Sequence, residues 1–138
     1  SMSNNNMTFN EYVRILINKP KKFTQNHIIF NSKFDTLVQY HSGNLDYDSN
    51  VSNNIIESNY DEISDGGKSN LLMFNGGILN NHIVTFEDNT IKSEKANYKS
   101  NLIYILNLSD TTPQTIKIIN NSMSGYKLVW KAHNQDYS

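Results

Sequence analysis

The chain contains no cysteine, only two prolines and two alanines, and no apolar run of the length that a membrane-spanning helix needs. The missing cysteines exclude disulfide scaffolds, thiolate zinc sites, iron–sulfur clusters and thiol catalysis. They do not identify a compartment, so the localisation stays open. The first ten residues also lack the basic and apolar segments of a secretory signal. We therefore expect no membrane span.

Asparagine is the residue in excess, with 23 positions among 138, beside 15 isoleucines. Codons rich in A and T produce this bias, so part of it indicates an AT-rich genome, such as that of a bacterium, a protist or a large virus. The net charge is only −1, and the polarity comes from amides and hydroxyls more than from charge. Disordered chains are typically highly charged, so this composition favours a folded protein.

Charges are segregated along the chain. Residues 1–33 carry a net charge of +4, residues 34–67 carry −7 without any lysine or arginine, and the remainder carries +2. The simplest interpretation is complementarity between neighbouring surfaces together with solubility. The alternatives are a basic segment that meets phosphate or an acidic partner, and an acidic segment that meets a cation or a basic partner.

One helix is predicted near the N-terminus. Thr8 and Glu11 have the spacing of a capping box, apolar residues follow at helical intervals, and Pro20 supplies the stop. We expect a helix over residues 9–18. Ser1 and Met2 resemble a cloning scar, which predicts a disordered tail over 1–7 and a single β-rich domain over 8–138.

The rest of the chain is predicted to form short strands separated by turn residues. Alternating apolar residues mark 102–108 and 126–132, for example. Strands at this spacing without intervening helices favour an antiparallel β-sandwich or a jelly-roll-like barrel. The interval from Gly43 to Lys68 shows no convincing strand, and a loop of that length is typically functional or mobile.

A calcium site is one hypothesis for the acidic interval. Asp46, Asp48, Asn50 and Glu57 follow the spacing of oxygen ligands in an EF-hand loop. Val51 stands where the loop needs glycine, and no entering helix is predicted. We expect no obligatory cofactor, with Ca²⁺ as the alternative.

A phosphate or nucleic-acid site is a second hypothesis. It would use four basic residues near the N-terminus, with Phe23 interleaved for base stacking: Arg14, Lys19, Lys21 and Lys22. The acidic overall balance and the absence of a recognisable motif count against nucleic acid as a partner.

A ligand-binding surface is the third hypothesis. Its planar and hydrogen-bonding side chains are Tyr40, His41, Tyr47 and Trp130. The four histidines show no metal-ligand or nucleophile spacing, so enzyme activity stays uncertain and is the less favoured reading.

These patterns favour a non-enzymatic structural, assembly or protein-interaction module, with a protein partner or self-association because sheet edges must be paired or covered. The first alternative is a carbohydrate-binding module that uses the aromatic and acidic loop, with or without a cation. The second is an enzyme whose site is assembled from distant residues. No internal repeat and no family resemblance is evident in the sequence.

Overall fold

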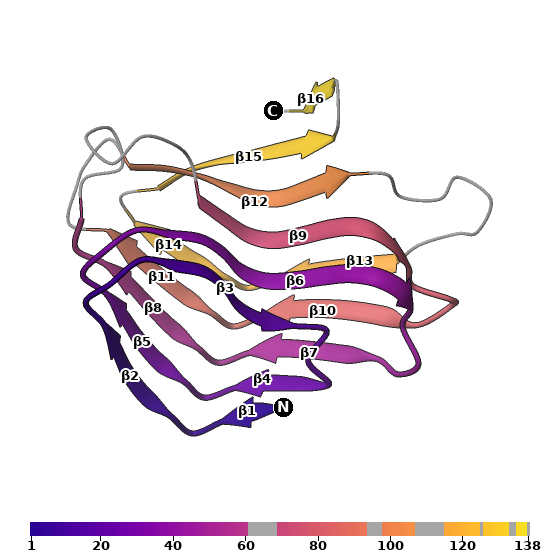
Figure 1. The fold of residues 1–138 in the computed structure, drawn as a ribbon, viewed down its shortest axis with the longest axis horizontal. Coiled ribbons are helices and arrows are strands. Elements are labelled where there is room, and N and C mark those ends of the chain that lie inside the picture. The colour runs from indigo at the N-terminus through magenta and orange to yellow at the C-terminus, as the bar shows by residue number, and fades with distance from the viewer. Residues whose placement is uncertain (61–68, 94–97, 107–114, 125, 133–134, 138) are drawn as a thin grey trace.

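The computed structural model describes residues 1–60, 69–93, 98–106, 115–124, 126–132 and 135–137. The chain winds through successive coils, and each coil adds one strand to each of three sheets, which we call A, B and C (Figure 1). Neighbouring coils pair their strands in parallel throughout, and the antiparallel pair β15–β16 is the exception among the described strands. This architecture is a parallel β-helix, in which each coil contacts mainly its neighbours.

The strands follow the coils in strict order. Sheet A contains β1 (Met2–Ser3), β4 (Lys22–Thr24), β7 (Ser49–Ser52), β10 (Ile83–Glu87) and β13 (Thr115–Ile119). Sheet B contains β2 (Asn6–Phe9), β5 (His27–Phe30), β8 (Ile55–Ser58), β11 (Thr90–Ser93) and β14 (Ser122–Ser124). Sheet C contains β3 (Val13–Asn18), β6 (Phe34–Asn44), β9 (Ser69–Ile78), β12 (Tyr98–Leu106), β15 (Tyr126–Ala132) and β16 (Gln135–Tyr137).

The prediction of a mainly β chain is confirmed, but the antiparallel sandwich or jelly roll is wrong. Alternating apolar residues identify a strand without identifying its partner. A parallel pair needs a long crossover connection, usually a helix, and the sequence shows no helices between the predicted strands. In this fold the strands of the other two sheets make the crossover.

The predicted helix over residues 9–18 is also wrong, because the described chain contains no helix and Val13–Asn18 forms strand β3. Val13, Ile15 and Ile17 also recur at every second position, which is the strand period. They lie opposite Phe34, Thr36 and Val38 of β6. Pairing with the next coil overrides the local capping box, and β-branched residues favour that outcome. Correspondingly, no helix of the described part could cross a membrane.

The acidic interval is not one long loop. Strands β7 and β8 lie within it, and their inward residues Val51 and Ile56 are buried in the core. Residues 61–68 lie outside the described part. At the other end, residues expected in the N-terminal tail form β1 and the start of β2.

Aromatic side chains stack through the core between the sheets. Phe9, Phe30 and Phe34 form a continuous stack, with ring centroids 5.4 and 4.2 Å apart, and Tyr60 meets Phe34 edge-on at 6.4 Å. Tyr40 and Phe74 stack at 4.8 Å between neighbouring strands of sheet C. Such pairs add to the free energy gained by burying their apolar surface.

An asparagine ladder runs along the turns that join sheet A to sheet B. Its members are Asn5, Asn26, Asn54, Asn89 and Asn121. From Asn26 onward, each Oδ1 accepts hydrogen bonds from the main-chain N–H and the Nδ2 of the ladder asparagine in the preceding coil, at 2.9–3.1 Å. The Nδ2 groups of Asn26, Asn54, Asn89 and Asn121 also each donate to a main-chain carbonyl of the preceding coil, at 2.8–3.2 Å.

The residue before every ladder asparagine has a positive φ, between 51° and 59°: Asn4, Gln25, Asn53, Asp88 and Asn120. Asparagine and aspartate tolerate this left-handed region better than most residues. The positive φ turns the chain sharply, and the next side chain then lies inside the turn. Three of the 23 asparagines, Asn26, Asn54 and Asn89, are thereby buried at 1% exposure.

Candidate binding groove on sheet C

The outward face of sheet C carries a cavity of about 310 Å³. That volume lies at the lower end of the range for small-molecule sites. Strands β3, β6 and β9 supply its walls, and most of the lining side chains are polar: Arg14, Ile15, Asp35, Thr36, Gln39, His41, Asn70, Met73 and Asn75. We call this cavity the sheet C groove. It crosses parallel strands, which lie about 4.8 Å apart in any sheet.

Gln39 forms part of the groove wall and is only 6% exposed. Its Oε1 has no hydrogen-bond partner within the described chain. On the same sheet, Asn101 donates from Nδ2 to Asn70 Oδ1 at 2.7 Å, while its own Oδ1 is also unpaired there. Buried acceptors are normally paired, so these two amides have unmet bonding capacity, and Gln39 is the one that lines the groove.

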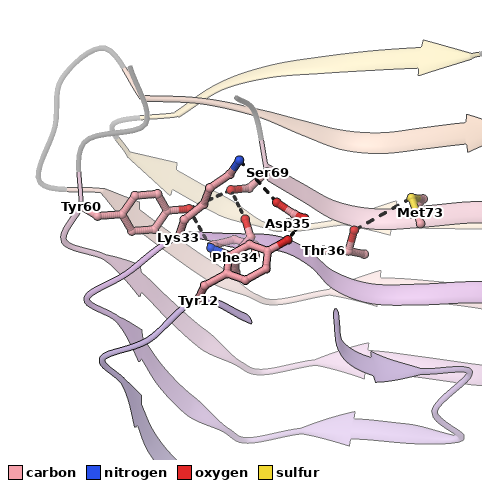
Figure 2. A network of polar contacts seen from close by, with 8 residues as sticks. All are labelled: Tyr12, Lys33, Phe34, Asp35, Thr36, Tyr60, Ser69 and Met73. Carbon is pink, nitrogen blue, oxygen red and sulfur yellow. Dashed lines mark hydrogen bonds and ion pairs between the residues drawn. The ribbon is translucent and has the colours of Figure 1, made fainter. Parts of the chain in front are cut away.

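Asp35 is already engaged by neighbours on one side of the groove. Tyr12 donates its hydroxyl hydrogen to Asp35 Oδ2, and Lys33 Nζ lies 3.5 Å from Asp35 Oδ1 (Figure 2). The hydrogen bond to Asp35 is the main cause that raises the pKa of Tyr12, followed by burial and the negative charge of Asp35. Both carboxylate oxygens therefore face a donor from the protein.

Arg14 stands opposite Asp35 in the register of β3 and β6, since the flanking pairs are Val13 with Phe34 and Ile15 with Thr36. The ion pairs of the described residues nevertheless do not include Arg14. Its side chain is exposed and lines the groove. A guanidinium in this position offers several N–H donors to a molecule in the groove.

Polar contacts join the segments from which the groove is built. Thr36 Oγ1 donates to Met73 Sδ at 3.9 Å, and Ser69 Oγ donates to the Phe34 carbonyl at 2.7 Å. Tyr60 and Ser69 also join through their hydroxyls at 2.8 Å (Figure 2). These bonds tie β6 to β9. The register between the two strands then shifts beside His41, where a bulge changes the direction of the outward side chains.

The structure separates the four residues predicted for ligand binding. Tyr40 is buried at 1% exposure, with its hydroxyl 2.6 Å from Ser49 Oγ, and burial raises its pKa. Tyr47 is half-buried and donates to the Lys19 carbonyl at 2.5 Å. His41 is the member that lines the groove. Trp130 belongs to β15, and its side chain lies outside the described part.

The four residues predicted for a cation also lie apart. Asp46 and Asp48 precede β7, Asn50 belongs to β7 in sheet A, and Glu57 belongs to β8 in sheet B. Asp48 Oδ1 accepts from the Ile83 main-chain N–H at 2.9 Å and faces His82 Nδ1 at 3.2 Å, and these contacts lower its pKa.

The remaining parts of that predicted calcium loop have other partners. Glu57 Oε2 lies 2.5 Å from His27 Nε2 on the outward face of sheet B. Asn54, at the ninth position of the supposed loop, is a ladder residue buried in the turn. No cluster of three or more metal-ligating side chains occurs among the residues that the structure describes.

The basic residues predicted for phosphate are spread over two sheets and the turn between them. Arg14 is exposed on sheet C, whereas Lys22 is exposed on sheet A, in strand β4. Lys19 is half-buried in the connecting turn, where its φ is 45°, and Lys21 is exposed beside Pro20. Of these four, only Arg14 lines the groove.

Sequence reasoning missed most of the groove, including Asp35, Gln39, Asn70 and Asn75. These residues lie within strands or beside them, and no motif links positions from three successive coils. A comparison of the chain with protein-family models, with curated proteins and with solved structures found no match. The functional argument therefore depends on the geometry of the groove.

Proposed function

We propose that the chain is a binding module that holds a saccharide in the sheet C groove. The observation that carries this proposal is the set of polar side chains that line the cavity, with the unpaired amide oxygen of Gln39 in its wall. Sugar hydroxyls both donate and accept hydrogen bonds. The groove offers matching groups of both kinds, such as the Asn70 and Asn75 amides and the Arg14 guanidinium.

The direction of the groove supports an extended ligand. It spans β3, β6 and β9, so a chain molecule lying along the helix axis meets a new strand at every step of about 4.8 Å. Each step presents side chains of the next coil. A rigid sheet holds these side chains in place before the ligand arrives, which lowers the entropic cost of binding.

Replacing Gln39 by leucine tests the proposed function. We expect this variant to bind glycans about tenfold more weakly, since a hydrogen bond of the order of 1.4 kcal/mol is lost. Its thermal stability should stay equal or rise, because leucine removes a buried oxygen that has no partner. The measurement is a glycan array of dextran, cellulose and galactan oligosaccharides, each in neutral, carboxymethylated and sulfated form.

The matched control is Asn50→Leu, which changes an exposed amide on the outward face of sheet A. It should leave glycan binding unchanged. If the unmodified protein retains no oligosaccharide on the array, the proposed function is wrong. If Gln39→Leu lowers the melting temperature and leaves binding intact, Gln39 has a structural role alone.

Self-association is the second candidate function. Within the part of the chain that the structure describes, strands β1, β2 and β3 each pair on one side only. The same coil carries half-buried apolar side chains, among them Met7, Phe9 and Leu16. An unpaired strand edge with apolar neighbours is a template for pairing with a second copy of the chain.

Light scattering across a concentration series tests this candidate. We expect the mass to rise toward that of a dimer, and Thr8→Pro on edge strand β2 to restore the monomer, because proline is tolerated at sheet edges but blocks further pairing. A constant monomer mass at high concentration would exclude this function. The melting temperature of the variant shows whether the coil itself is intact.

A further inference from the structure

We propose that the saccharide in the sheet C groove is acidic, and that Arg14 binds its anionic substituent. This inference rests on the proposed function and adds the charge of the ligand to it. Arg14 lines the groove, is exposed, and has no ion-pair partner among the described residues.

Among the described residues, one carboxylate lines the groove, that of Asp35, and the protein itself satisfies it. Tyr12 donates to one oxygen and Lys33 lies beside the other (Figure 2). Asp35 is therefore held by donors other than Arg14, although Arg14 stands opposite it in the sheet. The N–H groups of the Arg14 guanidinium are therefore available to donate hydrogen bonds to a ligand.

The geometry of a guanidinium favours particular anions. Its planar fork matches the two oxygens of a carboxylate or of a sulfate ester, and charge-assisted bonds of this type are about twice as strong as neutral ones. Gln39 lies on β6, one coil after Arg14 and four residues beyond Asp35, which stands opposite Arg14. It then meets a hydroxyl of the same ligand. Both kinds of ligand, carboxylated and sulfated, carry an anionic group on a polyhydroxylated chain.

The distribution of charge agrees with this assignment. Residues 1–33 carry a net charge of +4 in a chain whose total is −1. Strand β3, which forms one side of the groove, belongs to this basic segment. An acidic ligand is therefore attracted to that side, and Asp35, the acid of residues 34–67 that lines the groove in the described part, already faces donors from Tyr12 and Lys33.

The test compares Arg14→Gln with Lys22→Gln on the same oligosaccharide array. Both variants remove one positive charge, but Lys22 is exposed on sheet A, away from the groove. We expect the unmodified protein to bind the carboxymethylated or sulfated form of a backbone more tightly than the neutral form. Arg14→Gln should weaken binding to that form about tenfold and abolish the preference, while Lys22→Gln retains it.

Each outcome has a separate meaning. A preference for carboxymethylated over sulfated members, or the reverse, identifies the anion. Equal binding of neutral and acidic forms overturns the inference and leaves the proposed function intact. An equal loss of binding in the two variants has the same meaning, because it indicates a general effect of charge. Absence of binding to every oligosaccharide overturns both.

Discussion

Replacing Asn54 by alanine is expected to lower the free energy of unfolding by about 3–5 kcal/mol, one of the largest losses a single substitution in this chain can cause. Asn54 is 1% exposed and occupies the centre of the asparagine ladder. Its Oδ1 accepts from the main-chain N–H and the Nδ2 of Asn26, and its Nδ2 donates to Asn89 Oδ1 and the Phe23 carbonyl.

The loss is large because the substitution leaves partners behind. The Asn26 N–H, the Asn26 amide and the Phe23 carbonyl each lose a bond inside a turn that excludes water. An unpaired buried group costs its full desolvation, about 1–3 kcal/mol, whereas the net gain from making the bond is smaller. Chemical denaturation monitored by circular dichroism measures the change.

Asn59→Ala is the matched control for Asn54→Ala. Asn59 also stacks on an asparagine of the preceding coil, through Nδ2 to Asn31 Oδ1 at 3.0 Å, but this contact is exposed. Water can replace it, so a loss of about 0.5 kcal/mol or less is expected. Equal losses in the two variants would contradict a special role for the buried ladder.

The ladder also explains how coils of unequal length stack in register. Successive ladder asparagines are separated by 21, 28, 35 and 32 residues. The same four bonds recur at each step from Asn26 to Asn89, so the turn between sheets A and B is constant. The differences in length are taken up elsewhere, in the strands of sheet C and the connections around them.

This irregular spacing is the reason that the sequence predicts the strands better than their arrangement. Tyr126–Ala132 has the expected bounds, because alternating apolar residues mark a strand whatever its partner. A repeat of fixed length would have indicated a solenoid, and none exists here. The one available signal was a turn asparagine preceded by a residue that tolerates positive φ, as at Asn53–Asn54.

The candidate site was less predictable for a related reason. Gln39 was not predicted at all, and Arg14 was predicted only within a basic cluster; the parallel register of β3 and β6 brings the two to one groove. The acidic and aromatic residues near Tyr40 had a more conspicuous pattern. That pattern has a structural basis instead, since Tyr40 packs on Phe74 inside the core.

Replacing Phe34 by alanine is the second change with a large expected effect, a loss of about 3–5 kcal/mol in the free energy of unfolding. Phe34 is fully buried and stacks on Phe30 at 4.2 Å, with Tyr60 edge-on at 6.4 Å. Alanine leaves a cavity where the corner between sheets B and C is filled, and the neighbouring rings lose their contacts. Denaturant unfolding measures the loss, and Phe34→Leu serves as the control.

Leucine at position 34 keeps much of the apolar volume, so that variant should lose clearly less than alanine does, of the order of 1–2 kcal/mol. Both variants retain the main-chain bonds of this position, in which the N–H faces the Tyr60 hydroxyl at 3.4 Å and the carbonyl accepts from Ser69. The loss in Phe34→Leu therefore measures the aromatic stack, and the further loss in Phe34→Ala measures the cavity. If Phe34→Ala unfolds at the same denaturant concentration as the unmodified chain, the stack does not hold sheets B and C together.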